Sequence, residues 1–259
     1  MPPGYQRMGR VLLLRLPPTY RPFFSVIGRA WQEVLGVATV LTQVGPPVGE
    51  LREPRVELLA GTGTETEVVE HGVRWRFDAA RIMFAAGNRT ERRRAGLLPR
   101  PGEVVVDLFA GIGYFAIPAA LGGSGVRVVA VEKNPTAYRY LLENVARNRV
   151  SGRVTCFLGD NRTVPLDART ADRVFLGYLP DALPWVPRAL ELLRPSGGWV
   201  HVHTVADARE ACAAASARVD AAARAAGATV QAPVLAREVK PYGPGRTHVV
   251  VDARLTPRP

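Results

Sequence analysis

The stretch Val104-Val-Val-Asp-Leu-Phe-Ala-Gly-Ile-Gly113 decides the fold class. Its first part is a short continuous apolar run, which is typical of a buried strand in a parallel sheet. Its second part supplies two glycines, Gly111 and Gly113, where the chain can turn tightly and let a ligand approach the backbone. The pattern predicts a strand that ends at Asp107, then a glycine turn, then a helix that begins near Tyr114.

Strand-like and helix-like segments alternate after this stretch. We expect further strands at 126–132, 154–158, 172–176 and 199–204, and helices at 114–121, 135–148, 183–193 and 206–226. Two last strands are expected at 229–240 and 247–255, on either side of residues 241–245. The alternation predicts an α/β fold, a doubly wound Rossmann-like sheet with an antiparallel end.

The segment before the alternation is predicted to be a small mixed α+β domain. Strands are expected at 11–16, 37–44, 56–60, 66–70 and 73–77, and a helix at 20–35. We expect Gly45-Pro46-Pro47 to end the second of these strands and His71-Gly72 to form a hairpin turn. The predicted domains are residues 1–77 and, for the sheet with its ligand site, residues 78–259.

The composition indicates a globular protein with an anionic partner. Hydrophobic residues make up 47% of the 259 residues, which is enough for a packed core. The net charge of +11 favours a polyanion such as RNA, although a merely solvated basic surface is the alternative. No apolar run approaches the roughly 20 residues that span a bilayer, and no export signal is evident, so we expect a cytoplasmic protein. The two cysteines, Cys156 and Cys212, lack the clustered spacing of a metal site or a disulfide framework.

Acidic residues end three of the predicted parallel strands, at Asp107, Glu132 and Asp160. Open α/β sheets bind ligands at the carboxyl ends of their strands. Glu132 is placed to accept hydrogen bonds from both hydroxyls of a ribose, and Asp160-Asn161 lies where an adenine amino group would be. Ala116 stands where a dinucleotide fingerprint has its third glycine, which alone does not exclude a dinucleotide. The aspartate at the start of the motif, Asp107, and the lack of a second nucleotide-binding half favour S-adenosylmethionine over a dinucleotide. The alternative is that these acids only cap helices or lie at solvated strand ends. That would explain a single acid, but it explains less well why three acids occupy equivalent positions.

With these residues in place, the chain resembles the tRNA wybutosine-synthesising protein 2 family, which is related to the tRNA guanine-37 N1-methyltransferases. The resemblance covers about residues 11–255 and rests on residues 82–92, 107–113, 131–135, 159–162, 176–180, 201–204 and 240–244. It implies a transferase that moves the 3-amino-3-carboxypropyl group of S-adenosylmethionine, its co-substrate, to 4-demethylwyosine at position 37 of phenylalanine tRNA. The anticodon loop of that tRNA is the expected partner, and a monomer without metal is the expected form.

The resemblance and the strand ends together assign a set of cofactor-binding residues. They are Phe84, Ala85, Arg92, Asp107, Gly111, Gly113, Glu132, Lys133, Asp160, Asn161, Leu176 and Gly177. The family often has Ser-Pro at positions 85 and 86, where this chain has two alanines; a backbone contact survives that change and a hydroxyl contact does not. Arg92 suits bidentate pairing with the methionine carboxylate, with a phosphate or surface contact as the alternative. Glu91 matches the position where the related methyltransferases place a general base, with a surface or capping role as the alternative.

The stretch Leu176-Gly-Tyr-Leu-Pro180 bears on which carbon of the cofactor reacts. The related guanine-37 methyltransferases have Asn-x-Pro there, whose polar group orients a nitrogen nucleophile. This chain has no carboxamide or carboxylate at these positions, which favours transfer to a ring carbon. A guanine-37 methyltransferase and a non-catalytic RNA-binding module that retains the fold are the alternatives.

Basic residues are expected to form an RNA-facing rim around the mouth of the site. The candidates are Arg89, Arg93, Arg94, Arg100, Lys240 and Arg246, each of which is also consistent with a solvated charge. Tyr178 is a candidate for stacking on a base taken out of its stack, or else a core residue. His201 and His203 alternate along one strand and so share a face. Because further ligands for a metal are lacking, they are expected to support the floor of the active site or to hydrogen-bond within the sheet.

Overall fold

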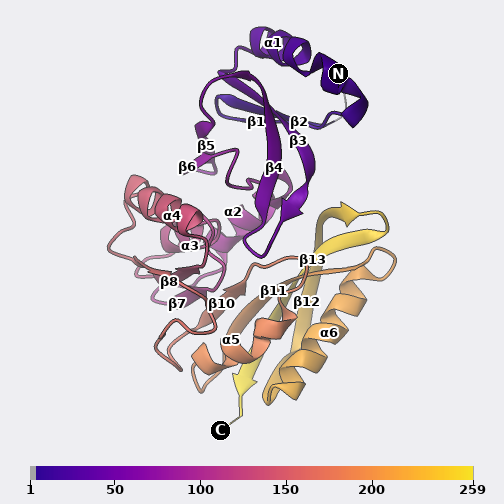
Figure 1. Cartoon of the computed structure of the whole chain (residues 1–259). Coiled ribbons are helices and arrows are strands. Elements are labelled where there is room, and N and C mark those ends of the chain that lie inside the picture. The colour runs from indigo at the N-terminus through magenta and orange to yellow at the C-terminus, as the bar shows by residue number, and fades with distance from the viewer. Residues whose placement is uncertain (1–3, 259) are drawn as a thin grey trace. The chain divides into compact units, whose positions relative to one another are not determined.

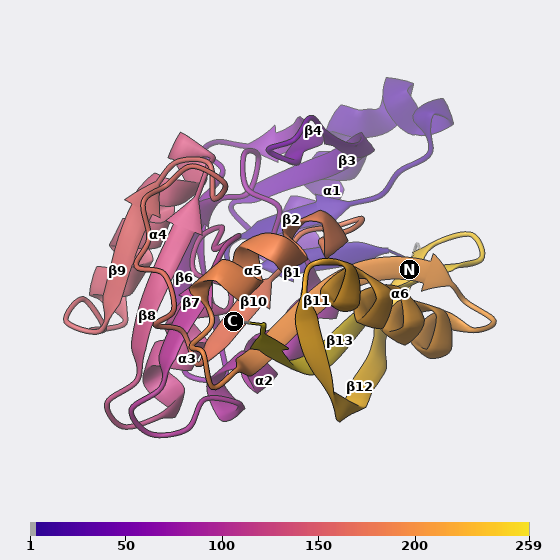
Figure 2. The ribbon, with the colours of Figure 1, turned by 90° about the horizontal axis from the view of Figure 1, so that it is seen from below.

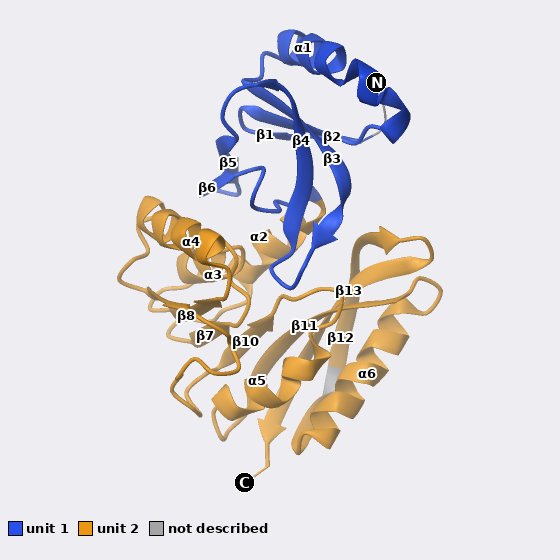
Figure 3. Ribbon diagram, viewed as in Figure 1, with its two compact units in different colours: residues 1–86 blue, residues 87–259 orange. Residues whose placement is uncertain are grey.

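The computed structural model describes residues 4–258, and Figure 1 shows the whole chain. Residues 1–86 and residues 87–259 form two compact units, coloured separately in Figure 3. No helix within residues 4–258 is both long enough and apolar enough to cross a membrane.

Unit 1 contains a four-stranded sheet in the order β1-β2-β3-β4 and a separate hairpin. Its elements are β1 (Tyr5–Met8), β2 (Val11–Leu14), η1 (Pro18–Phe23), α1 (Phe24–Leu35), β3 (Thr39–Val48), β4 (Glu53–Gly61), β5 (Glu65–Glu70) and β6 (Val73–Asp78). The strands β2 and β3 are parallel, and α1 connects them. Apolar residues of α1, including Trp31, pack on Leu12, Leu14 and Val40 of these strands.

Three details of unit 1 differ from the expectation, and the first is the strand β1, which was not predicted. The strand β3 continues through Gly45-Pro46-Pro47 to Val48 instead of ending there. Register shifts between Gln43 and Val48 absorb these residues, as is usual for proline in a sheet. The single helix expected at 20–35 is a 3-10 helix followed by an α-helix.

Unit 2 is built on a seven-stranded sheet in the order β12-β13-β11-β10-β7-β8-β9. The strands are β7 (Val104–Asp107), β8 (Arg127–Glu132), β9 (Val154–Leu158), β10 (Arg173–Leu176), β11 (Gly198–Asp207), β12 (Ala228–Gly243) and β13 (Arg246–Pro257). The five strands from β11 to β9 are parallel, whereas β13 runs antiparallel to both β11 and β12. The predicted doubly wound sheet with an antiparallel end is confirmed.

The helices of unit 2 lie on both faces of this sheet. They are α2 (Arg89–Leu97, preceded by η2, Ala86–Asn88), α3 (Ala116–Gly122), α4 (Pro135–Arg147), α5 (Val186–Leu192, preceded by η3, Leu183–Trp185) and α6 (Ala211–Ala225). Figure 2 shows α6 alongside the β11–β13 end of the sheet. The helix α2 was not predicted, and α6 begins five residues later than expected because β11 continues to Asp207, paired with β13.

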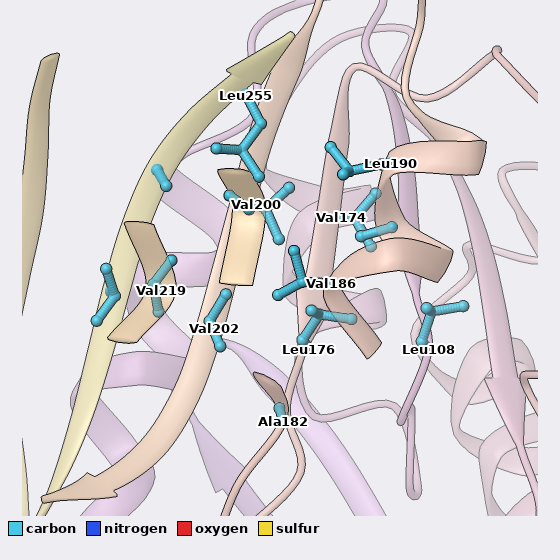
Figure 4. Packing of buried hydrophobic residues seen from close by; sticks show 14 of the residues in the cluster. Leu108, Val174, Leu176, Ala182, Val186, Leu190, Val200, Val202, Val219 and Leu255 are labelled. Carbon is cyan, nitrogen blue, oxygen red and sulfur yellow. The ribbon is translucent and has the colours of Figure 1, made fainter. Parts of the chain in front are cut away.

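The main core of unit 2 lies between the sheet and α5 and α6. Leu176, Val200 and Val202 of the strands meet Val186 of α5 and Val219 of α6, as Figure 4 shows. On the other side of the sheet, α2 packs closely on α3, where a Cβ at Gly96 would lie 3.0 Å from the Pro118 carbonyl oxygen. These layers fix the carboxyl ends of β7, β8, β9 and β10, where the candidate site lies.

Candidate functional site

The turn after β7 can be made only with glycine at two positions. Gly111 has φ +56° and Gly113 has φ +103°, conformations that residues with a side chain rarely adopt. A Cβ at Gly111 would lie 2.6 Å from the ring of Tyr114, and one at Gly113 would overlap the side chain of Ile117. The bare backbone of this turn is therefore a structural requirement, because Tyr114 and Ile117 occupy the space that a side chain would need.

Glu132, at the end of β8, fastens this turn to the neighbouring strand. Its Oε2 accepts a hydrogen bond from the Gly111 N–H at 2.7 Å, and its Oε1 accepts one from the Asn134 N–H at 2.7 Å. Burial raises the pKa of Glu132. Asn134 in turn caps α4, because its Oδ1 accepts from the Thr136 N–H at 2.8 Å. The sequence analysis did not single out Asn134, although Asn followed by Pro135 is a recognisable helix start.

Asp107 is fully buried at the end of β7. Its Oδ1 accepts a hydrogen bond from the Phe109 N–H at 3.2 Å, whereas its Oδ2 is buried with no hydrogen-bond partner in the described part of the chain. Burial, with Glu132 adding a smaller electrostatic effect, raises the pKa of Asp107 to about 7. An unpaired carboxylate oxygen beside a glycine turn suits a ligand that brings a cationic donor. S-Adenosylmethionine carries an ammonium and a sulfonium, so these residues fit that group.

The segment after β9 brings the third strand end into the same edge of the sheet. Asp160 accepts from Lys133 Nζ at 3.0 Å and from Arg162 Nη2 at 2.6 Å, and these cations hold its pKa well below the usual range. Asn161 donates from Nδ2 to the Leu108 carbonyl oxygen at 2.6 Å. The structure therefore connects residues that follow β7, β8 and β9, as predicted from their phase along the chain.

The helix α2 places two charged residues in the interior of the protein. Arg92 is 2% exposed and Glu91 4% exposed. Burial raises the pKa of Tyr114, and the positive charge of Arg92 opposes that rise, which places Arg92 near the tyrosine that covers Gly111. Glu91 is directed elsewhere: its Oε1 accepts from Arg237 Nε at 2.8 Å and its Oε2 from Arg94 Nε at 3.1 Å.

Asp252 of β13 is the centre of the ionic network that holds α2. It accepts two hydrogen bonds from Arg94, at 2.9 and 3.0 Å, one from Arg237 at 3.2 Å and one from His201 Nδ1 at 2.5 Å. Arg173 Nη1 lies 2.7 Å from His201 Nε2. Because a guanidinium only donates, Nε2 must accept and Nδ1 must carry the hydrogen. His201 is therefore neutral, and burial lowers its pKa to about 4.

A second buried histidine pair lies next to this network. His203 Nδ1 is 2.9 Å from His248 Nε2, and burial lowers the pKa of His203 to about 3. The ring of Phe115 packs on His203, with 5.1 Å between the ring centres. The expectation that His201 and His203 hydrogen-bond within the sheet is met.

The end of β10, at Leu176 and Gly177, carries no polar side chain. Leu176 is fully buried, and a Cβ at Gly177 would lie 2.7 Å from Phe115. Tyr178 stacks on Phe109 with 5.2 Å between ring centres and also contacts Trp185. Tyr178 thus belongs to an aromatic cluster, and its stacking on a base stays a prediction.

The basic residues expected at the rim do not all lie together. Arg89, Arg93 and Arg246 are exposed, and Lys240 packs along Gly87. Arg94 is not at a free rim, because its guanidinium is held by Asp252 and Glu91. Arg100 precedes β7, so it lies at the amino-terminal edge of the sheet, opposite the glycine turn.

Two of the expected cofactor residues belong to unit 1. Phe84 is buried and stacks on Phe77 with 4.8 Å between ring centres. Its carbonyl oxygen accepts a hydrogen bond from Gln6 Nε2 at 2.7 Å. Ala85 follows it and is half-buried. Their roles toward a cofactor stay predictions.

A parallel sheet, a glycine turn fastened by the acid of the next strand and a buried aspartate with one unpaired oxygen define an S-adenosylmethionine-dependent transferase. The TRM5/TYW2 methyltransferase domain matches residues 66–231, and the TYW2 N-terminal domain matches residues 1–64. The chain belongs to the TRM5/TYW2 family.

Several similar proteins are known. A tRNA(Phe) (4-demethylwyosine(37)-C(7)) aminocarboxypropyltransferase of Pyrococcus horikoshii is 36% identical over 98% of this chain and 90% of its own length. The crystal structure of P. horikoshii TYW2 in complex with MeSAdo has a TM-score of 0.88 at 34% identity, covering 100% of this chain and 92% of that one. The structure of Methanocaldococcus jannaschii TYW2 in complex with AdoMet has a TM-score of 0.78 at 33% identity, covering 98% and 100%.

Proposed function

We propose that this chain transfers the 3-amino-3-carboxypropyl group of S-adenosylmethionine to C7 of 4-demethylwyosine at position 37 of phenylalanine tRNA. The P. horikoshii relative is named for this activity, and its similarity spans 98% of the chain. The anticodon loop is then the part of the tRNA that enters the site, and the cytoplasm is the compartment we propose. The observation that carries the choice of reaction is the apolar end of β10.

The end of β10 favours a carbon nucleophile over a nitrogen nucleophile. Methylation of guanine N1 requires a polar group that orients the ring nitrogen and its proton. Leu176 and Gly177 offer no such side chain, and Phe115 fills the space beside Gly177. A ring carbon needs no hydrogen bond from the protein, so the lack of a polar side chain here is compatible with attack by C7.

The residues around the glycine turn are suited to fixing the cofactor rather than activating it. S-Adenosylmethionine supplies three electrophilic carbons on its sulfonium, and the one held in line with the acceptor reacts. We propose that Arg92 pairs with the methionine carboxylate, Asp107 faces a cationic group and Glu132 accepts from the ribose hydroxyls. Lys133, Asp160 and Asn161, which follow β8 and β9, are proposed to line the adenosine end.

The bonds balance without any further reactant. The acceptor ring carbon forms a bond to the methionine γ-carbon, and the bond from that carbon to sulfur breaks with its electron pair staying on sulfur. Methylthioadenosine leaves as a neutral product, and the attacked ring carbon releases its proton to water. Glu91, the residue expected to accept that proton, already accepts hydrogen bonds from Arg94 and Arg237 on its two oxygens. This environment favours Glu91 as an anchor of α2 over a role as base.

A double-label experiment tests the proposed reaction. S-Adenosylmethionine labelled either in the methyl group or in the carboxyl carbon is incubated with the protein and with phenylalanine tRNA that carries the tricyclic base. We expect the carboxyl label, and not the methyl label, to enter the tRNA.

Unmodified tRNA incubated in parallel serves as the control and is expected to take up neither label. Methyl label in either tRNA would instead establish a methyltransferase. No label in any tRNA would favour a non-catalytic RNA-binding module, against which the unpaired Asp107 oxygen already argues.

A further inference from the structure

Asn88 stands immediately before α2, where a side chain usually caps a helix. Asparagine is among the most favoured residues there, because its amide oxygen accepts from an N–H of the first turn. The side chain of Asn88 forms no such bond, and its Oδ1 is buried without a hydrogen-bond partner among residues 4–258. Leaving a buried amide oxygen without a hydrogen bond costs free energy, so a ligand that donates a hydrogen bond to it would be favoured.

The position of Asn88 relative to Arg92 indicates where that donor comes from. Residues four apart lie on one face of a helix, so Asn88 and Arg92 share a face of α2 at its amino-terminal end. Arg92 is 2% exposed and acts electrostatically on Tyr114, whose ring lies against Gly111. This face of α2 is therefore directed toward the glycine turn.

The neighbouring side of α2 is fixed. Glu91 and Arg94 are held by Arg237 of β12 and Asp252 of β13, through hydrogen bonds of 2.8 to 3.2 Å. The backbone at Gly87, just before Asn88, lies so close to Lys240 that a Cβ there would be 2.5 Å from the Lys240 Cδ. Because the ion pairs hold this helix in place, Asn88 and Arg92 are presented together from one end of it.

We propose that Asn88 binds the amino-acid end of S-adenosylmethionine, with its Oδ1 accepting a hydrogen bond from the α-ammonium while Arg92 pairs with the α-carboxylate. An ammonium has three donors and no acceptor, so an amide oxygen complements it, and one donor remains for each of two further acceptors. Two contacts from one rigid helix fix both substituents of the α-carbon. They thereby fix the direction of the γ-carbon, the atom that is transferred in the proposed function on which this inference rests.

The test uses ligands that differ only in the amino-acid arm. Affinities of S-adenosylmethionine, decarboxylated S-adenosylmethionine and methylthioadenosine are measured by calorimetry, without tRNA, for the full chain and for Asn88→Ala. We expect the variant to bind the first two ligands about tenfold more weakly or worse, because each has the amine. Methylthioadenosine lacks the arm, and its affinity should stay within about twofold.

Three further variants make the comparison specific. Arg92→Ala should weaken S-adenosylmethionine but not its decarboxylated form, which has no carboxylate to lose. Asn88→Asp keeps an acceptor and should retain affinity for both amine-bearing ligands. Thr90→Ala, an exposed change on the same helix, should bind all three ligands as the parent does.

Two results would overturn the assignment. An equal loss of methylthioadenosine affinity in Asn88→Ala would mean that Asn88 acts only through the fold of α2. Unchanged affinity for S-adenosylmethionine in that variant would mean that the amide contacts no part of the ligand. Because no transfer is measured, neither result depends on which group the enzyme moves to tRNA, and the double-label experiment decides that separately.

Discussion

Among the single side chains, Asp107 is a carboxyl that is wholly removed from water. The carboxyl is fully buried, one oxygen is paired with the Phe109 N–H, and burial raises its pKa to about 7 from 3.8. Between about pH 4 and pH 7, Asp107 is therefore protonated in the folded protein and ionised in the unfolded chain. Any stability that this proton confers is complete below the lower value and is lost as the pH rises through the higher one.

The variant Asp107→Asn tests the direction of this pH dependence of stability. The amide keeps an oxygen for the Phe109 N–H and cannot become charged. Relative to the parent, we expect its free energy of unfolding to change little at pH 4 and to be about 2–4 kcal/mol higher at pH 8, at roughly 1.4 kcal/mol per pKa unit. Urea unfolding at both pH values, without cofactor, measures the difference. A gain of the same size at pH 4 and pH 8 would contradict a raised pKa.

Among the elements, α2 is unusual because ion pairs connect it to neighbouring strands. Its sequence is rich in arginine, and Ala95 is its one fully buried apolar residue. The acids Glu91 and Asp252, bound by Arg94 and Arg237, connect it to β12 and β13 instead. Because buried ion pairs hold this helix in place, the loss of one partner leaves the others as uncompensated charges.

Asp252→Asn is the corresponding prediction. It removes the charge that faces Arg94, Arg237 and His201, and we expect the free energy of unfolding in urea to fall by about 3–5 kcal/mol. The affinity for S-adenosylmethionine should fall with it, because α2 presents Arg92. Asp220→Asn is the matched control: it breaks a surface pair with Arg224 and should leave both measurements unchanged. A similar fall in the free energy of unfolding in both variants would show that the buried network stabilises the protein no more than a surface ion pair does.

In the molecule as a whole, the positive charge is spread over both edges of the unit 2 sheet. Arg246 begins β13 and pairs in register with Asp207 at the far end of β11, on the side of the sheet that carries the glycine turn. Arg100 is exposed at the opposite edge, just before β7. Charges farther apart than about 10 Å are largely screened at moderate salt. Only the first edge should then contribute to holding tRNA at the site.

Charge reversals at the two edges separate local contact from net charge. Arg246→Glu and Arg100→Glu change the net charge equally. We expect Arg246→Glu to weaken tRNA binding about fivefold or more at 0.1 M salt and to reduce the slope of log affinity against log salt by about one. Arg100→Glu should do neither, as measured by filter binding. Equal effects would mean that tRNA responds only to overall charge.

The parts of the fold that depend on continuous apolar runs were predictable. The bounds of β7 and β9 agree with the prediction because each is a short run closed by a turn or a glycine. The helix α2 was missed because ion pairs, rather than a periodic apolar face, hold it. The extension of β11 was missed because only its partner β13 distinguishes residues 205–207 from the start of a helix.

The candidate site was predictable where sequence order alone sets the position. Glu132 and Asp160 follow consecutive parallel strands, so their phase places them at one edge. Arg94 and Arg100 could not be placed in this way, because their surroundings come from distant strands or from the opposite edge. The unpaired oxygens of Asp107 and Asn88 emerge only when every neighbour is known.

The position of β13 has a consequence for how the protein is made. It is the last strand along the chain, yet it lies inside the sheet, between β12 and β11. Its Asp252 meets Arg94 across a separation of 158 residues. A ribosome that adds about 5–20 residues per second needs roughly ten seconds or more to cover that distance. Once Glu132 has been made, the emerging chain has every residue of the glycine turn, but Arg94 still lacks its partner Asp252. The ability to bind cofactor should therefore arise only near the end of synthesis.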